Sequence, residues 1–592
     1  MLIRNEHKPY MAYKKEEKIQ PALKSNYRLP TLFGAISAVF VGLIGYSFFV
    51  QEKYHQELSS SSEARLVRTI REPALRGAIV DRNGTILAVS RYLKIATFNP
   101  RAIYAPKRKG DTINWNTISD AQFRQLAEVL QVPEAEVRAK LQNLSSQYVQ
   151  FKTELSLEDA DKLKALGIPT LYFEERTERS YPTGNLFSHI VGFANSKGQG
   201  LEGLELSQNK TLTGEDGKQV VLRDRHRNVI ELVDSPENVV AKSGETVTLS
   251  LDYNMQRLAR EQLQAALTQF KAKAGGAVVL DAQTGEVLAM SSLPDYDANH
   301  YGEYPVESRR NFTVGVTIEP GSVMKPFIVA KALDDGKINR NTWFNTSAYE
   351  LANKRISDTH EYGSLNTEGI LQKSSNVGVS KIAAMYDNQT LYHYLSAIGF
   401  GRKTQSGVVG EQSAALKAAN RWSRLDKAVM SYGYAITANL LQMAQGYTIF
   451  TTDGRLQPAT IFKQPNPQKG EVILQPETAR KMREMMISVT QKGGTGQAGA
   501  VPGYDVAGKT GTARKAINGR YEGKYVASFV GFAPAKNPRL IVAVSIDEPV
   551  GSYYGGTVAG PVFRGIMEGG LKLLNVAPTY VNADKNVQTA QR

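Results

Sequence analysis

The sequence predicts one membrane-spanning helix near the N-terminus, a mixed α/β module after it, and an α+β domain in which helices pack on one sheet. Three observations support this prediction. A single long apolar run carries no charge. The pattern of apolar residues changes near residue 245. Beyond that point, pairs of strand-like segments enclose a block of mostly helical sequence, which is typical of a sheet covered by helices.

Composition limits the classes of protein that fit. A chain of 592 residues is too long for one compact core. The absence of cysteine excludes disulfides, cysteine-ligated zinc and thiol catalysis. The net charge of +15 suits a nucleic acid, an anionic membrane or an acidic polymer as neighbour, or only a well-solvated surface. We find no zinc-finger spacing, basic region with heptads or RNP-type stretch, so nucleic acid is disfavoured.

Residues 29–51 form the uncharged run, and a helix of that length can cross about 30 Å of hydrocarbon. The preceding tail, residues 1–28, holds seven Lys/Arg against three Glu. The positive-inside rule therefore places this tail in the cytoplasm and everything from Glu52 onward outside. A cleaved signal peptide is the competing interpretation, but the run exceeds the usual ~7–15 residues and no A-x-A-like site follows it.

Small residues recur along one side of this helix at Gly34, Ala38 and Gly42. Such spacing lets a second membrane helix approach closely. We state as a hypothesis that this side docks a partner's helix. The general abundance of glycine in membrane helices explains the same pattern without a partner.

Residues 52–235 are expected to form the α/β module. In residues 71–90, alternating apolar residues flank Asn83-Gly84, which predicts a β-hairpin. A helix-rich stretch, about 120–166, and a glycine-containing, loop-rich segment, 181–217, follow. No active centre is evident in this module.

Residues 236–576 are expected to form the larger domain. A strand and an amphipathic helix are predicted over 245–270. One strand pair is predicted around the turn at 283–285, and another around the turn at 534–538. The sequence between the two pairs is mostly helical, and the polar residues 577–592 are predicted to be disordered.

The segment EPGSVMKP, residues 319–326, places Ser322 three residues before Lys325. On a helix these positions share a face, and Pro320-Gly321 predicts a turn that puts Ser322 in the first turn. Taken alone, the serine is more simply an N-cap. The same spacing also occurs at residues 207–210, in a segment that is predicted to be a loop.

Two further segments give the serine and lysine a chemical context. Ser374-Ser375-Asn376 stands at the head of a predicted helix, and Lys509-Thr510-Gly511 lies on a predicted edge strand. A second Ser-x-Asn at 364–366 shows that no single motif is decisive. Together and in order, S-x-x-K, S-x-N and K-T-G resemble the acyl-serine signature of penicillin-binding proteins and serine β-lactamases.

This chemistry requires that Lys325 acts as a base for the Ser322 hydroxyl. The pKa of the lysine must fall from ~10.4 toward ~7, which corresponds to about 4–5 kcal/mol. Burial of the lysine amine supplies part of this lowering of the pKa. The charge of Lys509, if it lies about 6 Å away in an effective dielectric near 20, contributes roughly 3 kcal/mol more.

The remaining residues have expected roles in binding and proton transfer. Lys509 and the hydroxyls of Thr510 and Thr512 suit a substrate carboxylate, Asn376 suits Lys325 and a substrate amide, and Ser374 can pass a proton to a leaving amine. The edge strand can pair with an extended peptide. Backbone N–H groups of Ser322 and Thr512 would form an oxyanion hole. The expected catalytic residues are Ser322, Lys325, Ser374, Asn376 and Lys509, and the expected substrate-binding residues are Thr510, Gly511 and Thr512.

From its anchor to about residue 575 the chain resembles the high-molecular-weight class B penicillin-binding proteins, specifically the division-specific D,D-transpeptidases of Gram-negative bacteria (FtsI type). The segments that carry this resemblance are RGAIVDRNGTILA, SHIVGFANSKGQGLEGLE, EPGSVMKP, SSNVGVSKIA and GKTGTA. The resemblance implies a periplasmic pedestal of the dimerisation type, and a transpeptidase domain with an antiparallel sheet flanked by helices, as in serine β-lactamases.

The resemblance also implies a reaction and partners. The serine attacks the D-Ala-D-Ala end of one peptidoglycan stem peptide and releases D-Ala, and an amine of a neighbouring stem, from diaminopimelate, resolves the acyl-enzyme. Covalent inhibition by β-lactams, an inner-membrane location at the septum and partnership with a membrane glycan polymerase and other division proteins are implied as well. No cofactor or metal is expected.

Other interpretations also fit the sequence. An elongation-specific class B enzyme differs only in its flanking segments. A β-lactam sensor or a non-catalytic division scaffold could retain the fold. The anchor and pedestal disfavour a soluble β-lactamase. A bifunctional enzyme would need a glycosyltransferase domain, and no E-D-x-x-F motif is recognisable.

Overall fold

The structure is a computed structural model and describes residues 28–104, 118–168, 170–223, 229–517 and 520–580. Apart from Arg28, the predicted cytoplasmic tail lies outside these residues. The chain forms two bodies: residues up to 70 with 218–238, and residues 71–217 with 239 onward.

The first body contains the apolar helix α1 (Arg28–Leu66) and a three-stranded sheet. The strands of this sheet, in spatial order, are β1 (Val67–Glu72), β6 (Gly217–Arg223) and β7 (Val229–Leu232). Residues Leu29–Lys53 of α1 are long and apolar enough to cross a membrane, and none of this stretch is buried in the protein. The helix continues to Leu66, so it extends well beyond the apolar run predicted at residues 29–51.

The second body begins with the pedestal module. Its strands are β2 (Ile79–Val80), β3 (Ile86–Phe98), β4 (Val149–Leu155), β5 (Tyr172–Ser180) and β8 (Val247–Thr248). Its helices are α2 (Pro100–Ile103), α3 (Asp120–Leu130), α4 (Glu134–Leu141), α5 (Leu157–Ala165), α6 (Ser188–Val191), α7 (Gly203–Ser207) and α8 (Asn209–Leu212). Strand β3 pairs with β2, β4 and β5, and β2 pairs in parallel with β8.

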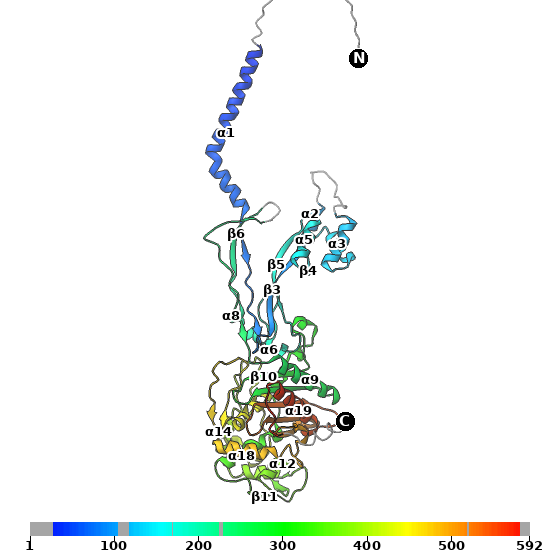
Figure 1. Ribbon diagram of the computed structural model, residues 1–592, viewed down its shortest axis with the longest axis vertical. Coiled ribbons are helices and arrows are strands. Elements are labelled where there is room, and N and C mark those ends of the chain that lie inside the picture. The colour runs from blue at the N-terminus through cyan, green and yellow to red at the C-terminus, as the bar shows by residue number, and fades with distance from the viewer. Residues whose placement is uncertain (1–27, 105–117, 169, 224–228, 518–519, 581–592) are drawn as a thin grey trace, which may run out of the picture. The chain divides into compact units, whose positions relative to one another are not determined.

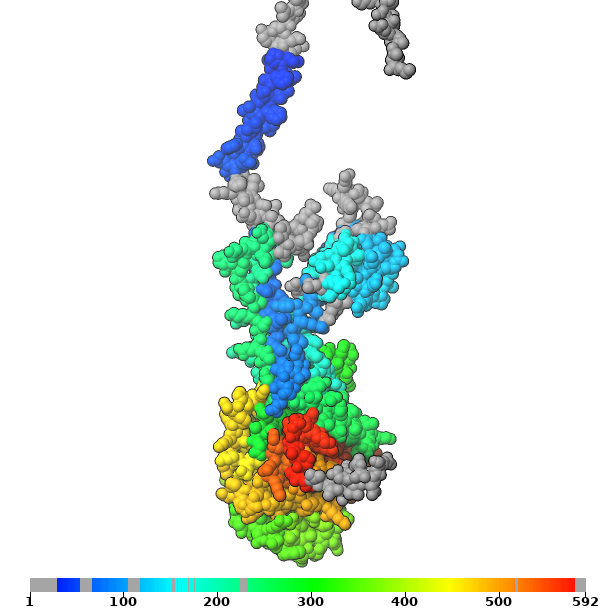
Figure 2. Space-filling view, in the orientation of Figure 1, coloured from blue at the N-terminus to red at the C-terminus, as the bar shows by residue number. Residues whose placement is uncertain are grey.

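The pedestal matches the predicted hairpin and differs from two other expectations. Strands β2 and β3 pair antiparallel around Asn83-Gly84, and Gly84 has φ +88°, as an Asn-Gly turn requires. Strand β4 interrupts the stretch predicted to be helical, because its residues pair with β3. The segment predicted as loops contains α6, α7 and α8. Figure 2 shows the lobe around α3, α4 and α5 as a distinct group of blue and cyan residues. This lobe has an apolar core of its own.

The C-terminal domain is built on a five-stranded antiparallel sheet. Its strands, in spatial order, are β10 (Val287–Leu293), β9 (Ala274–Asp281), β19 (Leu540–Asp547), β18 (Arg520–Ala533) and β17 (Ala507–Ile517). Both predicted strand pairs are confirmed, and the pairing of β9 with β19 joins them into the single sheet that was predicted.

Helices cover both faces of this sheet. Helices α9 (Tyr253–Gln269) and α19 (Gly555–Leu573) pack on one face and lie together in Figure 1. Ala277 and Val279 of β9 enter that core, whereas Val278 and Leu280 enter the core on the other face. This alternation follows from the two-residue period of a strand and explains why all four are apolar.

The remaining elements lie between β10 and β17 in the chain. The helices are α10 (Phe312–Gly315), α11 (Lys325–Asp334), α12 (Thr367–Lys373), α13 (Asn376–Ala383), α14 (Asn388–Ala397), α15 (Arg424–Ser431), α16 (Leu440–Gly446), α17 (Thr448–Thr451) and α18 (Pro476–Ile487). The 3₁₀ turns are η1 (Ala298–Glu303), η2 (Val306–Arg309), η3 (Gly321–Met324), η4 (Ala419–Arg421) and η5 (Gln497–Gly499). The short strands are β11 (Trp343–Asn345), β12 (Tyr349–Leu351), β13 (Lys354–Ile356), β14 (Ser364–Asn366), β15 (Arg455–Leu456) and β16 (Glu471–Val472).

The predicted disordered tail does not begin at Ala577. The backbone N–H of Thr579 donates to the Gly503 carbonyl at 2.8 Å, so this end of the chain is fixed to the domain. The rest of the tail, 581–592, lies outside the described residues.

Candidate active site

Ser322 lies in η3, a single 3₁₀ turn, and α11 begins only at Lys325. The prediction that Ser322 occupies the first turn of the α-helix is therefore wrong by one turn, because Gly321 enters this turn with φ +60°. The alternative that Ser322 is only an N-cap also fails. Neither η3 nor α11 has a side-chain cap, and Ser322 is partly exposed.

Two neighbours hold the Ser322 turn in place. The N–H of Gly321 donates to the Gly433 carbonyl at 3.0 Å, and the Tyr447 hydroxyl donates to the Val323 carbonyl at 3.0 Å. Gly433 has φ +88°, and a Cβ there would lie 2.0 Å from the Gly321 oxygen. Only glycine fits this close backbone contact.

The amine of fully buried Lys325 contacts the junction of α12 and α13. It lies 2.5 Å from the Ser374 carbonyl oxygen, 3.0 Å from Ser374 Oγ and 2.8 Å from Asn376 Oδ1. No hydrogen bond joins this amine to Ser322 in the part of the chain that the structure describes, although the sequence places both groups on one face. The amine is already engaged by these three oxygen atoms. In an enzyme without bound substrate, hydrogen bonds between catalytic groups are often longer than in the substrate complex.

Local backbone geometry turns Ser374 toward Lys325. Ser374 ends α12 in the left-handed conformation, with φ 60° and ψ 43°, which non-glycine residues adopt uncommonly. Ser375 then caps α13 through its hydroxyl. Asp358 accepts from the Ser375 hydroxyl at 2.5 Å and from the Val377 N–H at 2.9 Å. These contacts fix the junction that presents Ser374 and Asn376.

Lys509 comes to the same point from the sheet. Its fully buried amine donates to Ser374 Oγ at 2.9 Å and to the Thr510 carbonyl at 3.2 Å. Because the amines of Lys325 and Lys509 both contact Ser374 Oγ, they lie no more than about 6 Å apart. This limit agrees with the separation of about 6 Å at which Lys509 was expected to lower the pKa of Lys325.

Both lysines have lowered pKa values. Burial holds the pKa of Lys325 well below its ordinary value, and the charge of Lys509 lowers it further, whereas Asp358 raises it. Burial also lowers the pKa of Lys509 to about 7. We assign the neutral amine to Lys325, since it faces the second cation in addition to being desolvated.

The hydrogen bonds fit this assignment. A neutral Lys325 can donate to the Ser374 carbonyl and Asn376 Oδ1 and accept the Ser374 hydroxyl proton, while Lys509 donates to Ser374 Oγ. The Asn376 amide nitrogen donates to the Ser357 carbonyl at 3.1 Å, which orients its oxygen toward Lys325. Ser374 thus connects the two amines.

Strand β17 lies against the Ser322 turn, as its predicted place at the sheet edge allows. A Cβ at Gly511 would lie 3.0 Å from the Pro320 oxygen, so glycine permits this approach. The Thr512 hydroxyl accepts from the Gly555 N–H at 2.9 Å, and the Thr510 hydroxyl contacts that of Thr495 at 2.9 Å. Their predicted contacts with a substrate carboxylate stay a prediction.

The matching motifs elsewhere have structural roles. Ser207 and Lys210 belong to α7 and α8 in the pedestal, so the prediction of a loop there is wrong. Asn209 accepts from Arg76 and from the Gly200 N–H. Asn366 caps α12. The structure therefore brings together only the three motifs from 322, 374 and 509.

Sequence reasoning missed four residues that support the site. Asp358 and Gly433 lie in segments that match none of the motifs, and Tyr447 is one of many buried aromatic residues. Glu319 stands inside EPGSVMKP, where its carboxylate accepts from the Ala435 N–H at 2.8 Å and from the Tyr521 hydroxyl. Its position directly before Pro320-Gly321 is a signal that could have identified it.

Asp358→Asn should move the acid limb of serine acylation to lower pH. The Asp358 charge favours the ammonium form of Lys325, so its removal lowers the lysine pKa further. The asparagine oxygen can still accept from the Val377 N–H. The measurement is the pH dependence of the acylation rate with a chromogenic cephalosporin, with Asp335→Asn as the control. A shift to higher pH would contradict this electrostatic account.

Comparisons with known proteins agree with this arrangement. Residues 275–568 match the family model described as "Penicillin binding protein transpeptidase domain", and residues 71–249 match "Penicillin-binding Protein dimerisation domain". The chain belongs to the class B penicillin-binding proteins. Both parts of the family's domain pair are present, in the order that the sequence predicted.

Relatives align with this penicillin-binding protein over nearly its whole length. "Probable peptidoglycan D,D-transpeptidase PenA" of Neisseria meningitidis serogroup A is 45% identical over 581 residues, 98% of each chain. "Peptidoglycan D,D-transpeptidase FtsI" of Escherichia coli (strain K12) is 36% identical over 95% of this chain and 94% of its own. "Probable peptidoglycan D,D-transpeptidase PbpC" of Pseudomonas aeruginosa is 33% identical over 94% of this chain and 96% of its own.

Proposed function

We propose that this protein is a peptidoglycan D,D-transpeptidase that cross-links the cell wall through an acyl-Ser322 intermediate. The observation that carries the proposal is the meeting of the Lys325 and Lys509 amines at Ser374 Oγ, beside the Ser322 turn. The names of the relatives, all peptidoglycan D,D-transpeptidases, support the choice of substrate.

In the first half-reaction, Ser322 Oγ attacks the carbonyl of the penultimate D-Ala, and its proton passes to the neutral Lys325 amine. Backbone N–H groups of Ser322 and Thr512 would stabilise the oxyanion. The C–N bond then breaks, and the Ser374 hydroxyl gives its proton to the leaving D-Ala amine while it takes one from Lys325. The products are an acyl-serine ester, free D-Ala and a neutral Lys325.

In the second half-reaction, an acceptor amine from a neighbouring stem attacks the ester. Lys325 takes the proton that this amine loses and returns it to Ser322 Oγ as the ester bond breaks. Lys509 would hold the terminal carboxylate of the donor until D-Ala leaves, and its charge keeps Lys325 neutral between the steps. A β-lactam mimics the donor peptide, so it reacts with Ser322 in the first half-reaction and leaves a stable acyl-enzyme.

Ser322→Ala should abolish covalent labelling by a fluorescent penicillin, because the hydroxyl that forms the ester is lost. The wild-type protein should carry one adduct per chain. The control is Ser207→Ala, which removes a serine with the same spacing to a lysine and should label fully. Circular dichroism checks that both variants are folded. Labelled Ser322→Ala protein would mean that another residue is the nucleophile.

We further propose that the protein acts at the division septum, anchored by α1 with residues 1–28 in the cytoplasm and the enzyme in the periplasm. The flanking segments that resemble division-specific enzymes and the basic N-terminal tail support this. A membrane glycan polymerase and other division proteins are the expected partners. Depletion in the source bacterium should give filaments, whereas round cells would instead indicate the elongation-specific role.

A further inference from the structure

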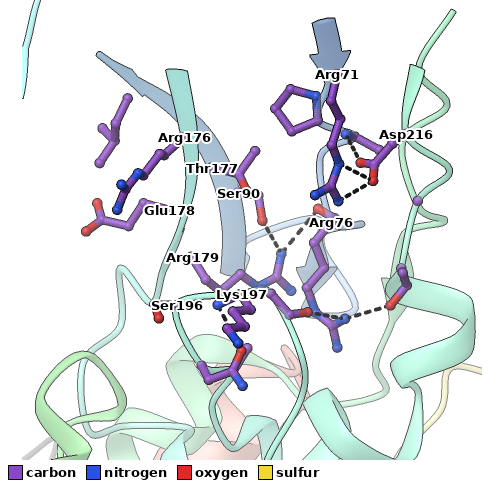
Figure 3. A pocket seen from close by; sticks show the side chains of 18 of the residues that line it. Arg71, Arg76, Ser90, Arg176, Thr177, Glu178, Arg179, Ser196, Lys197 and Asp216 are labelled. Atoms are coloured by element: carbon purple, nitrogen blue, oxygen red, sulfur yellow. Dashed lines mark hydrogen bonds and ion pairs between the residues drawn. The ribbon is translucent and has the colours of Figure 1, made fainter. Parts of the chain in front are cut away.

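The pedestal holds a cavity with a volume of about 540 Å³ that is separate from the Ser322 site. Its walls are formed by β3, β5 and two loops, residues 194–198 and 213–216 (Figure 3). This volume lies in the range of small-molecule sites, about 300–1,000 Å³. The cavity can therefore hold a peptide fragment.

Cationic side chains dominate the lining of this cavity. They are Arg71, Arg76, Arg176, Arg179 and Lys197. Two carboxylates, Glu178 and Asp216, also line it. Asp216 already binds Arg71, and Glu178 binds Arg91 at 3.2 Å. No charged partner of the exposed Lys197 amine is present among the described residues.

A buried ion cluster beneath the cavity carries a surplus positive charge. Arg76 and Arg179, each with a 5% exposed side chain, share the single carboxylate of fully buried Glu205 at 2.5 and 2.7 Å. Two guanidinium groups therefore face one carboxylate. Nη2 of Arg179 has no hydrogen-bond partner and is almost completely hidden from solvent. A buried charged donor without an acceptor is costly, so the cluster lacks one hydrogen-bond acceptor, and its surplus positive charge favours an anionic oxygen in that place.

Groups next to Arg179 can complete such a site. Ser90 Oγ accepts from Arg179 Nη1 at 3.3 Å, and its own proton has no acceptor among the described residues. Thr177 and Lys197 line the same cavity (Figure 3). Because water hardly reaches Arg179 Nη2, an oxyanion can bond it only after a neighbouring side chain moves.

We infer that this cavity binds a zwitterionic peptide with at least two carboxylates, one of which is held by Ser90, Lys197 and the guanidinium of Arg179. The Nε and Nη1 groups of Arg179 already donate to Glu205 and Gly77, so Nη2 is the guanidinium nitrogen that can donate a charge-assisted hydrogen bond to a carboxylate oxygen. Glu178 at the wall can accept from an amine of the peptide, but it would repel a polyphosphate or an anionic lipid head group. The cavity is therefore suited to a ligand that carries both positive and negative charges.

This inference rests on the proposed function for the identity of the peptide. The stem peptides of peptidoglycan carry several carboxylates and a free diaminopimelate amine. We assign the cavity to a stem peptide other than the one at the Ser322 site. The enzyme would then bind peptidoglycan at a second site.

The test uses the full chain in detergent with Ser322 first acylated by penicillin, so that the catalytic site is closed. The probe is a soluble stem tetrapeptide with a single terminal D-Ala, and binding is measured by calorimetry. We expect saturable binding of one peptide, weakened about tenfold or more by Lys197→Glu and by Ser90→Ala. Lys210→Ala, which removes an exposed pedestal lysine outside the cavity, should leave binding unchanged.

Equal binding by the wild type and the Lys197→Glu variant would overturn the assignment, as would no binding at all. In a second arm, soluble glycerol phosphate, which carries the anionic phosphate of a lipid head group, replaces the peptide, and binding of glycerol phosphate alone would also overturn the assignment. The penicillin reaction separates this test from that of the proposed function. Loss of labelling would contradict the Ser322 chemistry, whereas normal labelling without peptide binding would contradict only the second site.

Discussion

Lys325→Ala should lower the acylation rate of Ser322 by a factor of about 10³ or more at neutral pH, within the ~10²–10⁴ typical of a lost general base. The buried amine is the only side chain in the site with both a strongly lowered pKa and hydrogen bonds to Ser374 and Asn376. Arginine should not replace it, because a guanidinium keeps its proton. The measurement is stopped-flow acylation by a chromogenic cephalosporin.

Two comparisons separate a lost base from a damaged fold. Lys331→Ala removes a lysine from the same helix that pairs with Asp335 instead, and it should acylate normally. Added ethylamine should partly restore acylation in Lys325→Ala, with a pH dependence that follows the pKa of the added amine. Near wild-type acylation in Lys325→Ala without any amine would show that the base is elsewhere.

Gly433→Ala should destabilise the protein by about 3 kcal/mol or more and greatly slow acylation. The new Cβ would lie 2.0 Å from the Gly321 oxygen, and the φ of +88° at Gly433 is unfavourable for alanine. The turn that carries Ser322 must shift to relieve this contact. Urea unfolding gives the free energy, and penicillin labelling reports the turn.

Gly410→Ala is the matched control for this variant. Gly410 has φ +83°, but a Cβ there would meet no atom within 4 Å. Alanine at this position therefore costs only the backbone strain, about 1–2 kcal/mol, and should not change acylation. If the two variants behave alike, the contact between Gly433 and Gly321 does not position the nucleophile.

The sequence predicted the parts of the fold that depend on local pattern. Alternating apolar residues revealed β9 with β10 and β18 with β19, and the strand ends at 281 and 540 pair as neighbours in one sheet. The short helices α6, α7 and α8 escaped prediction because they are too short to show helical periodicity. Strand β4 was missed because its pairing with β3 is a long-range contact.

The residues of the site that the chemistry requires could be predicted from the sequence. The residues that only hold the backbone of the site in place were harder to predict. Residues 322, 325, 374, 376 and 509 stand in motifs, and the structure brings four of their side chains to one hydrogen-bonded cluster beside Ser322. Asp358 and Gly433 act through a cap and a backbone contact, and many sequences could supply these. The direction of the Lys325 amine, toward Ser374 instead of Ser322, depends on the left-handed turn at 374, which no residue type signals.

The most direct test of the account is the pH profile of Ser322 acylation by penicillin in the wild-type protein. The account predicts an acid limb far below the ordinary lysine pKa, from Lys325, and an alkaline decline that begins near pH 7, as Lys509 loses its charge. The rate should therefore peak at or below neutral pH. A rate that rises tenfold per pH unit through pH ~8 to ~10 would show that Lys325 keeps an ordinary pKa, which contradicts the account.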